Sequence, residues 1–491
     1  MSNQIIVGLD IGTTKIACFV GQRDEASRKV RILGFGKTES KGVEHGVVRN
    51  IFETAKSIKR AVSMAADQAD MDIGEVYVGI AGQHIKSMQN QGSIMIPSDH
   101  KYINEEDVCR LEDEQKQIML SPGEQIIHIF PQSYIVDGQP LSQEISPVGV
   151  SGKNLKGNFH IVTGNTINIT NIRDAVRSAG LHVSGVVLEP IASAYAVLDD
   201  RDRAAGVALV DIGGGTTDIA MFQDGVIRLT SVLPVAGNAI TNDIKEGCNI
   251  MINQAETLKT RFGSCLPSEV SENDIVSIPG IREQPAREIA LRTLAGIIKA
   301  RTESILEQVG YEIEQSGFYH KLIAGVVLTG GGARLRCIRE LASYTTGKET
   351  RIGIPNEHLV DDTPQELLHP MYATGIGLVL YGIQETENAE GRINNPAGMG
   401  QTMEEELEYQ EELQKAPFEA PAEEATPASI PETSTVSEPE PLYDEPEDGN
   451  RRNKDTSKKV GKGKLRTFGQ SISDYFKNIF NEPNIDPESD D

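Results

Sequence analysis

The chain has 491 residues, of which 38% are hydrophobic and 24% charged, and its formal net charge is −25. A chain of this size can bury one large core or two domains, and its strong negative charge argues against nucleic-acid binding, because phosphates repel it. Its five cysteines form no C-x-x-C pair and no apolar run is long enough to span a bilayer, so we expect a cytosolic body with free thiols and no zinc site.

Strand-like and helix-like segments alternate along residues 1–385. Short apolar runs that end at glycine-rich turns, such as QIIVGLD, AGVALVDIGG and IAGVVLTGGG, are typical of buried strands in an α/β sheet. Apolar residues recur with a helical period over Asn50–Ala69 and Ala286–Val309, and both segments are predicted to be helices. The predicted fold class is therefore α/β.

Two near-copies of one pattern carry the strongest signal. Val7–Val20 reads VGLDIGTTKIACFV, and Ala208–Phe222 reads ALVDIGGGTTDIAMF. Each predicts a β-hairpin rather than a strand–turn–helix unit, so neither is a Walker A loop or a Rossmann fingerprint. One glycine-rich hairpin turn is common in proteins, but two copies that both begin with Asp-Ile-Gly favour a functional duplication.

The residue types in the two hairpins suit a complex of phosphate and metal. Glycine lets backbone N–H groups approach phosphate oxygens, threonine hydroxyls add hydrogen bonds, and Lys15 can reach a β- or γ-phosphate. Asp10 and Asp211 would repel bare phosphate but suit Mg²⁺, directly or through its waters. A third segment, VVLTGGGARL (Val326–Leu335), predicts a strand that ends in a turn flat enough to lie against a ring or a phosphate.

These segments resemble the motifs of a known superfamily. DIGTTK, DIGGGTTD and LTGGGA resemble the two phosphate motifs and the adenosine motif of the actin, Hsp70 and sugar-kinase superfamily, and Leu188–Leu198 and Met371–Gly382 resemble its two connecting helices. Within the superfamily, Ser146–Gly164 and Val76–Ile85 resemble segments that flank or close subdomain 1C of the bacterial cell-division family FtsA. GNAITNDI, AETLKTRFG and SIPGIREQPAREI resemble signatures of its subdomains 2A and 2B, whereas Val150 stands where the family pattern has methionine.

The resemblance implies a duplicated, two-lobe actin-like fold with an inserted subdomain. The expected boundaries are 1–85 and 164–205 for subdomain 1A, 86–163 for an SHS2-like subdomain 1C, 206–240 and 318–385 for subdomain 2A, and 241–317 for subdomain 2B. A disordered linker, acidic and then basic, is expected at 386–463, and an amphipathic helix at 464–481.

The resemblance also implies a function. FtsA is an actin-like ATP-binding protein that forms protofilaments on the cytoplasmic face of the bacterial inner membrane and anchors the FtsZ ring there, at the division site. The implied partners are the C-terminal peptide of FtsZ through subdomain 2B, other copies of the chain, other division proteins through subdomain 1C, and the anionic membrane surface. The implied cofactors are ATP and Mg²⁺, with weak or no hydrolysis.

Carried over position by position, the resemblance implies a set of site residues. The nucleotide is expected to contact Asp10, Gly12, Thr13, Thr14, Lys15, Asp211, Gly213, Gly214, Gly215, Thr216, Thr217, Gly237, Glu256, Lys259, Gly330, Gly331 and Gly332. Mg²⁺ would lie near Asp10 and Asp211. Glu189 is the candidate for positioning the attacking water, and Arg301 is the candidate for facing the FtsZ peptide.

Other interpretations stay open. Glu256 and Lys259 could be a surface pair on one helix, Glu189 could simply be the first residue of a helix, before Pro190, and Arg301 could lie on a solvated helix face.

A sugar or acid kinase of the same superfamily is the alternative function, although no carboxylate base beside a sugar pocket can be identified. An Hsp70-like chaperone is disfavoured because no β-sandwich pattern follows Gln384, and pilus-type or rod-shape relatives are disfavoured by the tail and the insert.

The end of the chain has a pattern of its own. Residues 386–450 carry 18 acidic and 2 basic side chains, and residues 451–481 carry 9 basic and 2 acidic ones. On a helix, the large apolar residues of LRTFGQSISDYFKNIF fall within an arc of about 140°; they are Leu465, Phe468, Ile472, Tyr475, Phe476, Ile479 and Phe480. An apolar stripe beside a basic flank predicts a helix in the interface of an anionic membrane, and docking on a protein partner or on the body is the alternative.

Overall fold

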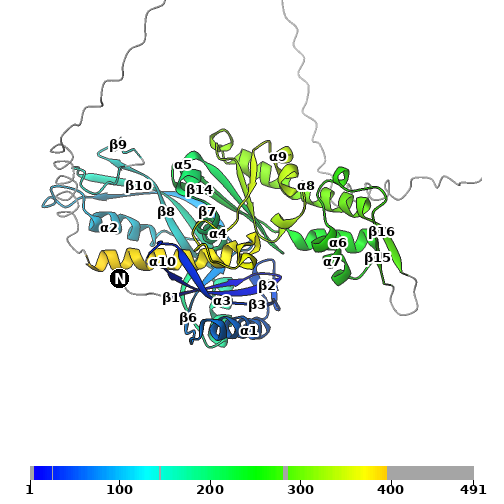
Figure 1. Ribbon diagram of the computed structural model, residues 1–491. Helices are drawn as coiled ribbons and strands as arrows, with labels where there is room; N and C mark the ends of the chain where they lie inside the picture. The colour runs from blue at the N-terminus through cyan, green and yellow to red at the C-terminus, as the bar shows by residue number, and fades with distance from the viewer. Residues whose placement is uncertain (1–4, 25, 143–144, 280–285, 395–491) are drawn as a thin grey trace, which may run out of the picture. The chain divides into compact units, whose positions relative to one another are not determined.

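The computed structural model describes residues 5–24, 26–142, 145–279 and 286–394, and two five-stranded sheets form their framework (Figure 1). The strand order of the first sheet is β11 (His182–Leu188), β6 (Glu75–Ile80), β1 (Ile5–Ile11), β2 (Lys15–Arg23) and β3 (Val30–Glu39). The order of the second is β14 (Val226–Leu233), β13 (Thr217–Gln223), β12 (Val207–Ile212), β17 (Val326–Thr329) and β18 (Thr350–Ile352).

The two sheets have the same topology. In chain order, β1 forms an antiparallel hairpin with β2, which pairs antiparallel with β3, and β12, β13 and β14 pair in the same way. In addition, β1 pairs in parallel with the later strand β6, and β12 with the later strand β17. The strands β1 and β12 are buried along almost their whole length, as expected for apolar runs covered on both faces. The predicted α/β class and the predicted pair of hairpins are confirmed.

Helices cover both faces of the first sheet. On one face lie α1 (Ile51–Ala69) and α3 (Thr166–Ser178), and their apolar residues form one core cluster with the strands. The predicted helix Asn50–Ala69 is α1, and Asn50 is its N-cap, because its side chain accepts a hydrogen bond from the N–H of Glu53.

Two further helices connect the sheets through a shared core. They are α4 (Glu189–Val197) and α10 (Ala373–Asn394), the predicted connecting helices. One cluster of buried residues joins Phe19 of β2, Ile191 of α4, Leu209 of β12 and Ile376 of α10. Gly377 lets the two helices approach, because a Cβ there would collide with the carbonyl of Ala192. A single continuous core therefore joins the two sheets.

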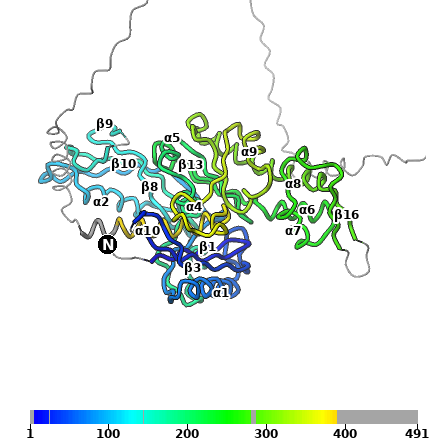
Figure 2. The backbone as a smooth tube through the Cα atoms, viewed as in Figure 1, coloured from blue at the N-terminus to red at the C-terminus, as the bar shows by residue number. Residues whose placement is uncertain are grey.

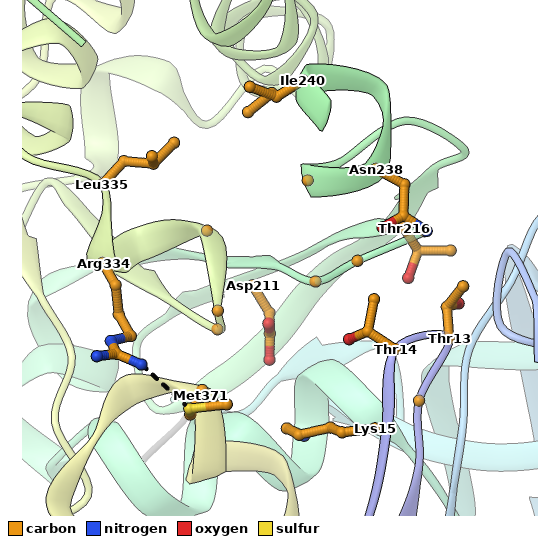
Figure 3. Close-up of a pocket in the computed structure, with 18 of the residues that line it drawn as sticks. Thr13, Thr14, Lys15, Asp211, Thr216, Asn238, Ile240, Arg334, Leu335 and Met371 are labelled. Atoms are coloured by element: carbon orange, nitrogen blue, oxygen red, sulfur yellow. Dashed lines mark hydrogen bonds between the residues drawn. The ribbon is translucent and has the colours of Figure 1, made fainter. Parts of the chain in front are cut away.

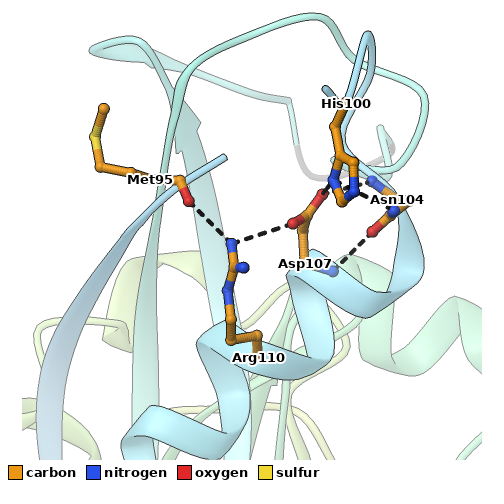
Figure 4. A network of polar contacts seen from close by, with 5 residues as sticks. All are labelled: Met95, His100, Asn104, Asp107 and Arg110. Atoms are coloured by element: carbon orange, nitrogen blue, oxygen red, sulfur yellow. Dashed lines mark hydrogen bonds and ion pairs between the residues drawn. The ribbon is translucent and has the colours of Figure 1, made fainter. Parts of the chain in front are cut away.

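The segment between β6 and α3 forms a separate four-stranded sheet. Its order is β7 (Lys86–Met95), β10 (Asn154–Asn165), β8 (Glu124–Val136) and β9 (Gln139–Pro140), and α2 (Glu105–Gln115) packs against it. Asp107 is buried at the start of α2 and bonds to His100, Asn104 and Arg110 (Figure 4). We call residues 86–163 the insert.

The second lobe carries a helical extension (Figure 2). There α6 (Gly237–Cys248) packs against α7 (Ile252–Phe262) and α8 (Leu291–Gln315), next to the hairpin of β15 (Ile275–Ile278) and β16 (Arg287–Ala290). The prediction of a helix from Ala286 is wrong in its first turn, because residues 287–290 pair with β15 before the helix begins at Leu291. The short elements are β4 (Val43–Glu44), β5 (Val47–Val48), α5 (Asp200–Ala205) and α9 (Ile338–Thr346).

Residues 386–394, which the sequence prediction placed in the linker, belong to helix α10. Helix α10 continues to Asn394, and the stretch TENAEGRIN contains no proline that would end it. The rest of the predicted linker and the stripe from Leu465 to Phe480 lie outside the described residues. Within the described part of the chain, no helix is both long and apolar enough to cross a bilayer. The subdomain boundaries themselves stay predictions.

Candidate functional site

The two predicted hairpin turns have matching geometry. In the first, the N–H of Gly12 donates to the carbonyl of Lys15 at 3.0 Å, and in the second the N–H of Gly213 donates to the carbonyl of Thr216 at 2.9 Å. Strand pairing closes both hairpins directly at these turns. The same local sequence pattern therefore builds the same turn twice.

The two turns touch each other. A Cβ on Gly214 would collide with the side chain of Thr14, and a Cβ on Gly215 would lie 2.6 Å from Oγ1 of Thr13. Oγ1 of Thr13 also accepts the N–H of Gly46 at 3.1 Å. In Figure 3, Thr13, Thr14 and Thr216 lie on the same side of the pocket. Only glycine at these positions lets the two backbones approach so closely.

The turns line a cavity of about 280 Å³. Glu189 and sixteen of the predicted nucleotide contacts line it: Asp10, Gly12, Thr13, Thr14, Lys15, Asp211, Gly213, Gly214, Gly215, Thr216, Gly237, Glu256, Lys259, Gly330, Gly331 and Gly332. Residues far apart in the sequence thus meet around one space, and they come from both sheets and from the helical extension.

Thr217 is the predicted contact that does not line the cavity. Its side chain is fully buried and donates a 2.7 Å hydrogen bond to the carbonyl of Val235. Side chains alternate along a strand, so Thr216 and Asp218 face the cavity while Thr217 faces the other way. The sequence prediction missed Asp218, although the hairpin register that pairs it with Asp211 could have indicated it.

Four carboxylates and one lysine occupy the inner end of the cavity. Lys15 forms an ion pair with Asp10; burial alone would lower the pKa of Lys15, but Asp10 and the other carboxylates raise it above its ordinary value. Burial, followed by the charges of Asp10, Asp218 and Asp211, raises the pKa of Glu189 well above its usual range. This end of the cavity holds excess negative charge that a bound cation would offset.

The two aspartates of the second hairpin are held differently. Burial raises the pKa of Asp211, and a hydrogen bond from Ser193 counteracts part of that rise. Burial and the nearby charge of Asp211 raise the pKa of Asp218 to about 8. Thr216 donates to Oδ2 of Asp218 at 2.9 Å, while Oδ1 is buried without a hydrogen-bond partner among the described residues. An unpaired buried oxygen is costly unless water or a ligand reaches it.

Glycines and cations also line the cavity. Gly330 has a φ of 84° and lies against Asp211, where a Cβ would collide with the carboxylate, so the position requires glycine. The sequence prediction also missed Arg261, Arg334 and Arg336, which line the cavity as well. Figure 3 shows Arg334 beside Met371, whose sulfur accepts a 3.5 Å contact from Nη1.

The pair Glu256 and Lys259 is more than a surface pair on α7. Nζ of Lys259 lies 2.7 Å from Glu256, 2.8 Å from Oγ1 of Thr241 and 3.0 Å from the carbonyl of Gly237. Its side chain is 11% exposed. The lysine therefore ties α7 to the start of α6 at the wall of the cavity.

Arg301 does not lie on a solvated helix face. Its Nε and Nη2 donate to the two carboxylate oxygens of Asp243 at 2.5 and 3.0 Å, and its side chain is 21% exposed. This bidentate pair joins α8 to α6. Arg301 does not line the cavity.

Comparisons with known proteins agree over most of the chain. The family model described as "Cell division protein FtsA" matches residues 208–377, "SHS2 domain inserted in FTSA" matches residues 82–163, and "Hsp70 protein" matches residues 165–233. Cell division protein FtsA of Pseudomonas aeruginosa is 36% identical over 384 residues, which cover 78% of this chain and 90% of that protein.

Other relatives agree with this match, and one solved structure has a similar fold. The FtsA proteins of Escherichia coli K12 and Bacillus subtilis 168 are 34% and 33% identical, over 79% and 77% of this chain and 93% and 84% of their own lengths. A structure of the PilM-PilN type IV pilus biogenesis complex has a TM-score of 0.56 at 16% identity, covering 78% of this chain and 99% of that one, a likeness of fold. The chain belongs to the FtsA family of cell division proteins.

Proposed function

We propose that this chain is the actin-like, ATP-binding cell-division protein that polymerises on the cytoplasmic membrane and anchors the FtsZ ring to it. The observation that carries the nucleotide part is the cavity in which two glycine turns, Lys15 and four carboxylates meet. Membership of the FtsA family supports the part in cell division.

The residues present fit a complex of Mg²⁺ and ATP. Backbone N–H groups at glycine turns suit phosphate oxygens, and the buried, unpaired Oδ1 of Asp218 suits a water of a metal's hydration shell. Among the described residues, no group of three or more His, Cys, Asp or Glu is placed to hold a metal by itself. One or two carboxylates together with substrate phosphates are the usual holders of Mg²⁺.

Each residue of the inner end would have its own task. Lys15 would contact a terminal phosphate, Asp10 and Asp211 would hold Mg²⁺ or its waters, and Glu189 would orient a water and accept its proton. A raised pKa makes Glu189 a stronger base, but it also leaves a larger fraction protonated at neutral pH. When bound, Mg²⁺ would offset the charge of the phosphates and of these carboxylates. The arrangement supports binding first and slow turnover second.

Replacing Asp211 by Asn tests the nucleotide part. We expect the affinity for Mg-ATP to fall about tenfold or more, because the carboxylate beside the metal loses its charge. The matched control is Asp174→Asn on the surface of α3, which should bind like the unmodified protein. Unchanged affinity of the Asp211 variant, with both variants folded by thermal melting, would exclude the assignment.

The membrane part rests on the apolar stripe. Phe476→Asp together with Ile479→Asp should abolish sedimentation with anionic vesicles, because both charges enter the apolar arc. Ser471→Asp together with Asn478→Asp adds the same charge outside the arc and should weaken binding only slightly. Equal sedimentation of the two double variants would contradict a membrane helix with this face. Electron microscopy on an anionic lipid monolayer with ATP tests polymerisation.

The FtsZ part centres on the helical extension and on Arg301. Arg301→Gln should weaken binding of the FtsZ C-terminal peptide, and Asp243→Asn should bind at least as well as the unmodified protein, because it frees the cation. If both variants lose binding equally, the Arg301–Asp243 pair only supports the local structure. Fluorescence anisotropy of a labelled peptide measures this.

A further inference from the structure

A histidine of the insert is bonded to the backbone next to Glu189. The N–H of Leu188 donates a 3.0 Å hydrogen bond to Nε2 of His128, which lies on β8. Leu188 is the last residue of β11, and Glu189 follows it. Since β11 is the edge strand of the first sheet, an N–H that points outward finds no neighbouring strand there. The insert supplies that partner.

The position of the His128 ring is fixed by its surroundings. Burial lowers the pKa of His128 to about 4, so the ring is neutral and Nε2 can accept a hydrogen bond. Its ring stacks on Phe130 at 5.3 Å and meets Tyr381 of α10 edge-on at 6.2 Å. Tyr381 in turn meets Tyr195 of α4 at 5.5 Å. The ring therefore packs against α10 through Tyr381, and Tyr381 in turn contacts α4.

The side chain of Glu189 depends on its backbone for its direction. No described residue donates a hydrogen bond to its carboxylate or forms an ion pair with it. It packs against Gly79, where a Cβ would lie 3.0 Å from its Cγ, and it is followed by Pro190, whose ring fixes its own φ at the start of α4. A small rotation of the Leu188 peptide would thus move the carboxylate inside the cavity.

The insert also bonds to the second lobe. Oγ of Ser87 donates to the carbonyl of Thr230 at 3.3 Å, Nε2 of His160 lies 3.1 Å from Oγ1 of Thr230, and the side-chain amide of Gln132 donates to the carbonyl of Ile227. Thr230 and Ile227 lie on β14, which pairs with β13 directly after the second phosphate turn. One face of the insert therefore contacts both β11, which leads to Glu189, and β14, which pairs with the strand after the second turn.

We propose that His128 is a positioning residue of the nucleotide cavity, through which the insert sets the position of Glu189. The inference rests on the proposed nucleotide-binding function and extends it to a residue outside the cavity. Because coupling between two sites is reciprocal, an occupied cavity would also favour one placement of the insert.

A double-mutant cycle tests the proposal. His128→Leu removes the acceptor, His128→Gln keeps one at a similar reach, and each is made alone and together with Glu189→Gln. The readout is the affinity for the Mg²⁺ complex of a non-hydrolysable ATP analogue between pH 6 and pH 8.5. Glu189 and a terminal phosphate repel each other, so the affinity should fall as Glu189 loses its proton on raising the pH. The groups that face Glu189, namely Asp10, Asp211, Asp218 and Lys15, also contribute to the pH profile, and the Glu189→Gln background separates their contribution from that of Glu189.

The expected pattern is specific to an action through Glu189. His128→Leu should change the ratio of affinities at the two ends of the pH range by about three- to tenfold, and His128→Gln by less than about twofold. In the Glu189→Gln background His128→Leu should have no further effect. The control His182→Leu, an exposed histidine at the other end of β11, should leave the pH profile unchanged.

Three results would overturn the proposal: an effect of His128→Leu that is equally large in both backgrounds, no effect at all, or a His128→Gln variant that behaves like His128→Leu. If the leucine variant does not fold, His128→Asn replaces it, because its acceptor falls short of the Nε2 position. A failure of the proposed function is distinct, since the unmodified protein would then bind no analogue. In that case faster amide exchange at Leu188 in the His128→Leu variant would still support the hydrogen bond, and unchanged exchange would refute it.

Discussion

The hydroxyl of Ser193 donates a 2.6 Å hydrogen bond to Oδ2 of Asp211, the carboxylate that precedes the second glycine-rich turn. Oγ1 of Thr374 donates to the same oxygen at 3.2 Å and lies 3.0 Å from Oγ of Ser193. Ser193 belongs to α4 and Thr374 to α10, so both connecting helices orient one carboxylate of the cavity.

Ser193→Ala should therefore raise the Mg²⁺ concentration that ATP binding requires. Loss of the hydroxyl removes a hydrogen bond that lowers the pKa of Asp211, so a larger fraction of Asp211 is protonated at a given pH. We expect the Mg²⁺ concentration for half-maximal ATP binding to rise about three- to tenfold at pH 6, and less at pH 8.5. Titration calorimetry measures it, and Ser178→Ala at the exposed end of α3 is the control; equal responses of the two variants would contradict the role.

The raised pKa of Asp218 predicts a pH dependence of stability without nucleotide. Its folded-state pKa of about 8 exceeds its ordinary value, so its contribution is fully present below the ordinary pKa and is lost as the pH rises towards 8. Asp218→Asn should raise the free energy of unfolding by about 1–3 kcal/mol at pH 8.5 and by clearly less at pH 5. Urea unfolding at the two pH values tests this, and a variant that is less stable at pH 8.5 would contradict it.

The contact between the two turns predicts an effect of a single methyl group. Gly214→Ala places a Cβ against the side chain of Thr14 and should separate the turns, lowering the affinity for Mg-ATP about tenfold or more. Gly296→Ala on α8 adds the same group where nothing lies within 4 Å, and should leave the affinity unchanged while stabilising the helix by about 1 kcal/mol. If the two variants bind equally, the turns do not act as one clamp.

Removing the buried carboxylate of the insert is expected to lower the stability of the protein. Asp107 completes the capping box of α2 by accepting the N–H of the N-cap residue Asn104, and it bonds to His100 at 3.0 Å and to Arg110 at 3.2 Å (Figure 4). Asp107→Ala should lower the free energy of unfolding by about 2–3 kcal/mol. Asp113→Ala, which removes an exposed pair with Lys116 on the same helix, should change it by less than about 1 kcal/mol. Similar urea curves for the two variants would contradict the difference.

Much of the cavity could be predicted because its turns are local. Asp10 and Asp211, the glycines after them and Lys15 belong to short segments in which turn chemistry and apolar strands act within a few residues. The same locality explains why both hairpins and α1 were predicted correctly. Thr217 belongs to the motif but does not line the cavity, because membership of a motif does not state which face of a strand a residue occupies.

The sequence by itself determined where the two glycine-rich turns form, since glycine, threonine and aspartate set the backbone and charge of a turn without help from distant residues. Only the tertiary structure decided which distant groups complete the site. The pairing of Arg301 with Asp243, the hydroxyl of Ser193 on Asp211 and the bond of His128 to Leu188 join separate elements. Such contacts depend on how the helices and sheets pack. The spacing of residues along the sequence does not show which side chains become neighbours in space.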